Sequence, residues 1–132
     1  MFGTTTLNKL IQHMAFENLK IIGERINPGF KSSKLLFDNE DVAGIQALAA
    51  EQVRNGASYI NINIGEKAVT KPVFMTDVIK AVQQVVSVPL SFDFPNADVQ
   101  ERCLKAYDRE KAGGQLPIVT RYRSCGGKCW IC

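Results

Sequence analysis

The feature of this chain that most constrains its fold is a repeated switch between strand-like and helix-like spacing of apolar residues. Segment 59–64 alternates strictly: Ile60, Ile62 and Ile64 share one side of a strand, and Tyr59, Asn61 and Asn63 share the other. If the isoleucines pack against helices, both asparagines face the opposite way. A buried amide without a partner costs about 1–3 kcal/mol. The two asparagines therefore require either a polar network or a ligand.

The same alternation of strand and helix continues along the chain. Strands are predicted at 19–26, 59–64 and 88–92, and a fourth begins at 116–119; the first of them is expected to be buried. Helices are predicted at 38–55, 72–86 and 97–107. Three acids, Asp38, Glu40 and Asp41, favour the start of the first helix, and Gly56 ends it. The second helix directs five residues inward: Val78, Ile79, Val82, Val85 and Val86. Short turns between strand and helix predict parallel strands joined by right-handed crossovers.

Length and charge exclude several classes of protein. A chain of 132 residues can form one modest domain, and no apolar run approaches the roughly 20 residues that span a bilayer. Segment 1–20 lacks the pattern of a secretory signal, so we expect a cytoplasmic protein without a membrane partner. The net charge of +3 comes from Arg121, Arg123 and Lys128; without them 13 basic residues balance 13 acidic ones. We therefore expect no nucleic-acid partner.

Composition divides the chain into three parts. Residues 1–18 are interpreted as an N-terminal extension, in which His13 is expected to be solvated rather than a ligand. Residues 19–119 carry the strand–helix pattern. Residues 120–132 form an atypical tail with three of the four cysteines and the only tryptophan.

Polar residues end the predicted strands. Asn27 follows the first, Asn63 ends the second, and Asp93 and Asn96 follow the third. In an α/β barrel the carboxyl ends of the strands face the ligand. Amides and a carboxylate suit a flat, hydrogen-bonding heterocycle better than a phosphate or a metal, so no metal site is predicted here.

Three motifs in order resemble those of a known family. They are Gly23-Glu24-Arg25-Ile26-Asn27, Asn61-Ile62-Asn63-Ile64-Gly65 and Phe92-Asp93-Phe94-Pro95-Asn96. Over 19–119 the chain resembles the pterin-binding barrels, and among them the methyltetrahydrofolate:corrinoid methyltransferases. Relatives of that family include the folate domain of cobalamin-dependent methionine synthase and dihydropteroate synthase. The resemblance implies the first three to four βα units of a (βα)8 TIM barrel, whose full length is roughly 250 residues.

The resemblance also implies a binding site for pterin. Asp93 matches the aspartate that accepts hydrogen bonds from the pterin ring, and Asn63 matches the asparagine of the second-strand motif. Asn61 stands where many relatives have Asp. Asn27 matches a residue that either contacts the ligand or organises the turn, and Asn96 either contacts the ligand or caps the following helix.

Other motif positions are expected to be structural or to alter the pocket. Glu24 and Arg25 are interpreted as structural residues at the barrel mouth. Phe94 replaces a small Ser that relatives often carry after the aspartate, which implies a differently shaped pocket.

Members of this family move a methyl group between tetrahydrofolate and the cobalt of a cobalamin held on a corrinoid protein, their partner. The barrel itself binds no metal, and the intact enzymes include homodimers. An asparagine on a later strand usually assists the leaving nitrogen. No catalytic residue is therefore assigned within this sequence, and the chain alone is expected to be inactive in methyl transfer and weak in pterin binding. The alternatives are a dihydropteroate synthase-like fragment and a non-catalytic module that completes a barrel with a second chain.

The tail supports two interpretations. One DNA spelling of residues 120–132, shifted by a single base, reads as a family-like Asn-Ser strand end followed by an amphipathic helix, which suggests a frameshift after Val119. The rival interpretation is a metal site built from Cys125, Cys129 and Cys132, although their spacing matches no common zinc pattern. Cys103 is predicted to be a small core residue.

Overall fold

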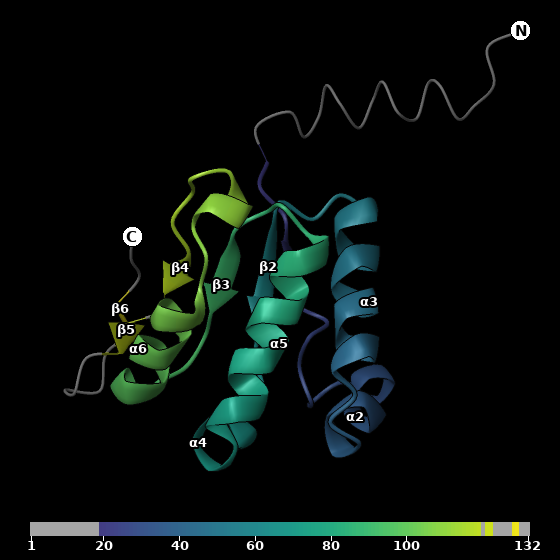
Figure 1. Cartoon of the computed structure of the whole chain (residues 1–132), viewed down its shortest axis with the longest axis vertical. Helices are drawn as coiled ribbons and strands as arrows, with labels where there is room; N and C mark the ends of the chain where they lie inside the picture. Colours follow the sequence, from purple (N-terminus) through teal and green to yellow (C-terminus); the bar gives the residue numbers. More distant parts are fainter. Residues whose placement is uncertain (1–18, 120, 123–127, 130–132) are drawn as a thin grey trace, which may run out of the picture.

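The computed structural model describes residues 19–119, 121–122 and 128–129 as a sheet with a layer of helices. The sheet contains β1 (Ile22–Gly23), β2 (Tyr59–Ile62), β3 (Leu90–Phe92) and β4 (Ile118–Val119). The helices are α2 (Lys31–Asp38), α3 (Val42–Arg54), α4 (Lys67–Thr70), α5 (Pro72–Val85) and α6 (Ala97–Ala106), followed by the 3-10 turn η1 (Glu110–Ala112). Figure 1 looks onto α3, α5 and α6, with the strands behind them.

The four strands are parallel and follow one another in the order β1-β2-β3-β4. This arrangement confirms the predicted α/β class with a parallel sheet. The described parts of the tail, β5 (Arg121–Tyr122) and β6 (Lys128–Cys129), form a separate antiparallel pair and do not extend the sheet. None of the helices in the described part of the chain is both long and apolar enough to cross a membrane.

The core lies between the sheet and the helices, as the alternating isoleucines predict. Ile60 and Ile62 are in register with Leu90 and Phe92, and all four are fully buried. Their face is the one toward the helices, because a Cβ added at Gly23, in register with Ile60, would lie 2.7 Å from a side-chain oxygen of α3. The helices complete this core; the buried residues that they contribute include Ile45, Leu48, Ala49, Met75, Val78, Ile79 and Val82.

Several predicted boundaries are wrong. The helix expected at 38–55 is α3 and begins only after Asp41, whose side chain accepts a hydrogen bond from Gly44 N at 2.9 Å. A separate helix, α2, precedes it and was not predicted. The strand expected at 19–26 is reduced to β1. Ile22 lies in register with Tyr59, on the sheet face that points away from the helices, and is 41% exposed. Val85, expected to face inward, is 47% exposed at the last turn of α5.

Candidate functional site

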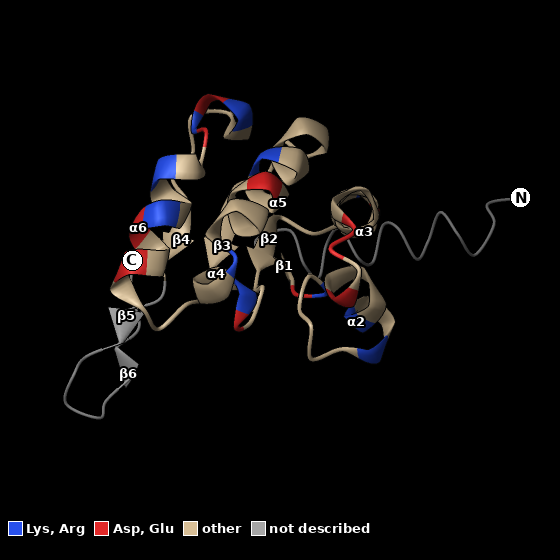
Figure 2. Cartoon of the chain, turned by 60° about the horizontal axis from the view of Figure 1, so that its bottom comes forward, with Lys and Arg blue, Asp and Glu red and all other residues tan. Residues whose placement is uncertain are grey.

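A cavity of about 480 Å³ lies at the carboxyl ends of β2 and β3. It contains three of the five residues expected to bind a ligand: Asn63, Asp93 and Asn96. Its other lining residues are Gly65, Glu66, Ala68, Val69, Phe94, Pro95 and Val99. Figure 2 turns the molecule so that this end of the sheet comes forward. We refer to this cavity as the strand-end pocket.

The side-chain oxygens of the asparagines hold the turns around the pocket. Asn63 Oδ1 accepts a hydrogen bond from Gly65 N at 2.9 Å, just after β2. Asn96 Oδ1 accepts from Asp98 N at 2.9 Å and from Val99 N at 3.2 Å, and so caps α6 as predicted. An amide oxygen used in this way leaves the –NH2 group as the donor that a ligand in the pocket could contact.

Asn27 and Asn61 do not line the strand-end pocket. Asn27 Oδ1 accepts a hydrogen bond from Gly29 N at 2.8 Å, so of its two expected roles the structure shows the turn-forming one. Asn61 is 6% exposed and lies in register with Ser91, on the sheet face opposite the isoleucines. In the part of the chain that the structure describes, no fully buried side-chain N or O atom lacks a partner.

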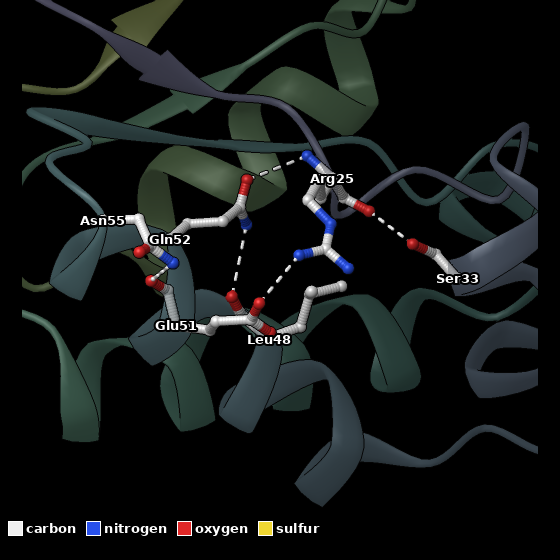
Figure 3. Close-up of polar contacts among 6 residues, drawn as sticks. All are labelled: Arg25, Ser33, Leu48, Glu51, Gln52 and Asn55. Carbon is white, nitrogen blue, oxygen red and sulfur yellow. Dashed lines mark hydrogen bonds and ion pairs between the residues drawn. The ribbon is translucent and has the colours of Figure 1, made fainter.

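The first motif is held by contacts of Arg25 with α3 and α2. Figure 3 shows Gln52 accepting a hydrogen bond from Arg25 N through Oε1 at 2.9 Å. The Arg25 guanidinium donates to Glu51 at 3.0 Å, and Ser33 Oγ donates to the Arg25 carbonyl at 2.6 Å. Arg25 is therefore structural, as expected, but its side chain turns toward the helix layer and away from the mouth of the sheet.

Lys67 of α4 and Lys71 in the turn after it form ion pairs with Glu40, and the sequence analysis did not predict this cluster. Lys67 Nζ lies 3.3 Å from Glu40 Oε1 and donates to the Phe37 carbonyl at 2.6 Å. Lys71 Nζ bonds to the same Glu40 oxygen. The hydrogen bond from Lys71 is the main reason that the pKa of Glu40 is held below its ordinary value of 4.5. The sequence feature that could have indicated this cluster is the spacing of Lys67 and Lys71, because side chains four residues apart lie on the same side of a helical turn.

A second cavity, of about 470 Å³, lies beside this cluster. Its lining residues are Glu40, Val42, Thr70, Lys71, Pro72, Val73, Phe74 and Asp77. Glu40 and Lys71 are bonded to each other at its wall, and Asp77 is the third charged residue of the lining.

Residues with raised pKa lie away from the strand-end pocket. Cys103 is fully buried on α6, and this burial raises the pKa of its thiol to about 12, as befits the core residue that was predicted. Burial also raises the pKa of Tyr107, whose hydroxyl donates to the Gln115 carbonyl at 2.8 Å. Neither group is placed to act on a ligand in the pocket.

Metal chemistry receives no support from the described residues, which contain no cluster of His, Cys, Asp and Glu that could hold an ion. His13, Cys125 and Cys132 lie outside the described residues, and so does the side chain of Cys129. The frameshift and metal interpretations of the tail therefore both remain predictions. A search against models of known protein families finds no match for this chain.

Proposed function

We propose that this chain forms the pterin-binding part of a (βα)8 barrel methyltransferase that moves a methyl group between methyltetrahydrofolate and a corrinoid protein. The observation that carries the proposal is the strand-end pocket, which gathers Asn63, Asp93 and Asn96 at the carboxyl ends of neighbouring parallel strands. That end of a parallel sheet is where α/β proteins bind their ligands.

The lining of the pocket suits a flat heterocycle that is rich in hydrogen-bond donors. A pterin offers a ring N–H and an exocyclic amine side by side, and a carboxylate such as that of Asp93 can accept from both. Charge-assisted hydrogen bonds of this kind are roughly twice as strong as neutral ones. The amide groups of Asn63 and Asn96 add donors for the ring's acceptor atoms. Val69, Pro95 and the other apolar lining residues provide surface for the faces of the ring.

In the proposed reaction, these residues bind and orient the pterin. Cobalamin, carried by the corrinoid protein, supplies the cobalt that exchanges the methyl group. The pterin nitrogen that releases the methyl group leaves poorly until it gains a proton or a hydrogen bond. None of the described residues is assigned that step; Asp93 contributes by holding the far edge of the ring, which fixes the position of the reacting nitrogen.

The test compares pterin with lumazine, which has an oxygen in place of the exocyclic amine. We expect the whole chain to bind 6-hydroxymethylpterin more tightly than 6-hydroxymethyllumazine, measured by isothermal titration calorimetry. Asp93→Asn should weaken pterin binding roughly tenfold or more, as expected for loss of a charged hydrogen-bond partner. The same variant should bind lumazine about as well as the wild type does.

The matched control is Asp77→Asn, which removes an exposed acid of α5 that lines the other cavity. It should leave both affinities unchanged. If the wild type binds neither compound, or if Asp93→Asn binds pterin as tightly as the wild type, the proposed function is wrong.

A further inference from the structure

The turn that joins α3 to β2 contains the only Asn-Gly pair of the chain, Asn55-Gly56. Asn55 is the C-cap of α3, and Gly56 follows it with a φ of 102°. Both residues are exposed. A Cβ built at Gly56 would meet no described atom within 4 Å, so the turn is open to solvent on this side.

An asparagine in this setting reacts with its own main chain. The Gly56 nitrogen loses its proton and attacks Asn55 Cγ, the new C–N bond closes a five-membered succinimide, and the Cγ–Nδ2 bond breaks to release ammonia. Water then opens the ring at either carbonyl, which gives aspartate or isoaspartate. In isoaspartate the main chain runs through Cγ and is one methylene longer. Glycine favours the attack because it has no side chain beside the nitrogen.

The turn after α2 provides a comparison site with almost the same backbone. Asn39 is the exposed C-cap of α2, with φ −90° and ψ −1°, and Asn55 has φ −90° and ψ 10°. Each is followed by a residue with positive φ, Glu40 in one turn and Gly56 in the other. The N–H of that residue bonds to the carbonyl three positions back, at 3.2 Å for Glu40 and at 3.0 Å for Gly56. The two sites therefore differ chiefly in the side chain that follows the asparagine.

Hydrogen bonds at the end of α3 control access to the reaction. Asn55 Nδ2 donates to the Glu51 carbonyl at 2.9 Å (Figure 3), and Gly56 N donates to the Val53 carbonyl at 3.0 Å. Both bonds must open before the ring can close, because they fix the side chain and the attacking nitrogen. The end of a helix opens locally at a lower free energy than the core does. The reaction therefore requires opening of this turn and not unfolding of the whole molecule.

We propose that Asn55 is a modification site, at which the folded chain forms aspartate and isoaspartate through a succinimide. Both products place a carboxylate at the C-terminal end of α3, where the helix dipole disfavours negative charge. Both also lose the amide donor that Asn55 gives to the Glu51 carbonyl. Isoaspartate in addition lengthens the main chain before Ala57 and Ser58, whose N–H groups bond to carbonyls of α3 and of the segment before β1. The modification therefore weakens the connection between α3 and the sheet.

The test incubates the whole chain at pH 8 and follows deamidation by mass spectrometry of tryptic peptides. Trypsin places Asn39 in peptide 35–54 and Asn55 in peptide 55–67, and fragment masses locate the change within each. Asn55 should react about tenfold faster than Asn39 or more, because only glycine leaves the attacking nitrogen uncrowded. The rate at Asn55 should be lower at pH 6, since the nitrogen must lose its proton.

The matched variant is Glu40→Gly, which gives Asn39 the same following residue as Asn55 and suits the positive φ of that position. It should raise the rate at Asn39 toward that at Asn55 and leave the rate at Asn55 unchanged. Equal rates at the two asparagines in the wild type, or no effect of Glu40→Gly on Asn39, would overturn the inference.

The consequence for stability is measured on the modified chain itself. Anion exchange separates it by its added negative charge, and electron-transfer fragmentation distinguishes isoaspartate from aspartate. The modified fraction should unfold at a lower urea concentration than the unmodified chain. Equal urea midpoints would show that the end of α3 does not depend on Asn55. None of these results bears on pterin binding, so the proposed function is tested separately.

Discussion

At the scale of single residues, Glu40 has the least expected conformation. It is the one non-glycine residue of the described chain with a positive φ, 51°, and it follows the C-cap of α2. Its N–H bonds to the Phe37 carbonyl, and that of Asp41 bonds to the Leu36 carbonyl, as in the helix-ending motif that usually has glycine here. The side chain offsets this strain by joining Lys67 and Lys71 to the turn.

This cluster predicts a pH dependence of stability. The pKa of Glu40 in the folded state lies below 4.5, chiefly because of the Lys71 hydrogen bond. Its carboxylate therefore stabilises the fold above about pH 4.5, and that contribution is lost as the pH falls through the lower folded-state pKa. At pH 7, Glu40→Gln should unfold at a lower urea concentration than the wild type. At pH 3, the difference between the two urea midpoints should be smaller.

The control for this experiment is Glu110→Gln, because Glu110 takes part in none of the ion pairs among the described residues. Its urea midpoint should equal that of the wild type at both pH values. A Glu40→Gln variant whose deficit is as large at pH 3 as at pH 7 would show that the carboxylate charge is not the stabilising feature.

Two buried glutamines, Gln52 and Gln83, also join segments that are distant in the sequence. Gln83 of α5 accepts from Asp108 N at 2.8 Å and donates to the Asp108 carbonyl at 2.9 Å. Gln52 of α3 holds Arg25 N in the same way from one side. These amides satisfy backbone groups beyond the ends of β1 and α6 that have no strand or helix partner there.

At the level of elements, the start of α6 shows the capping role of Asn96, one of the two roles that were expected. Asn96→Ala should lower the free energy of unfolding by about 1 kcal/mol, because two backbone N–H groups lose their acceptor. Asn96→Asp keeps an oxygen in the same place and should stay near wild-type stability, but it removes the –NH2 donor. The free energies of unfolding of the two variants and the wild type are measured by urea denaturation.

Pterin binding then decides whether Asn96 has a second role. If its amide contacts the ligand, Asn96→Asp should bind 6-hydroxymethylpterin more weakly despite its intact cap. Wild-type affinity in Asn96→Asp would assign Asn96 to capping alone.

The helices also show which boundaries sequence can predict. Asn96 is the only side-chain oxygen between Pro95 and α6, so the cap was predicted correctly. Before α3, Asp38, Glu40 and Asp41 all favour a helix start, and the choice of Asp41 follows from the turn at Glu40 that ends α2. The helix α2 buries only Ser33 and Phe37, so its sequence shows little of the apolar periodicity that predicts a helix.

At the scale of the whole molecule, the described part of the sheet has its three longer helices on one face (Figure 1). Sheets of parallel strands normally bury both faces. The second face bears Asn61 and Ser91, which are buried, and Ile22, which is 41% exposed and which the proposed barrel would cover.

The rate at which a reagent labels the Cys103 thiol measures how readily the core opens. Cys103 contacts Met75 with a sulfur–sulfur distance of 3.5 Å between α6 and α5, and its thiol has a pKa raised to about 12 by burial. In a variant with Cys125, Cys129 and Cys132 changed to Ser, we expect labelling by a thiol reagent at pH 8 to be slow and to quicken with urea as the core opens. Immediate labelling without urea would contradict the packing of α6 on α5.

Local sequence patterns were sufficient to predict the order of the four parallel strands and the three longer helices, the buried isoleucine face of β2 and the cap of α6. These features depend on residues close together in the chain, whose periodicity and capping chemistry act locally. Only the tertiary structure decided that Asn63, Asp93 and Asn96 share a pocket while Asn27 and Asn61 lie outside it. It also decided that Glu40 binds a lysine 31 positions away. Such contacts depend on how β2, β3 and the helices pack, and no local pattern encodes that packing.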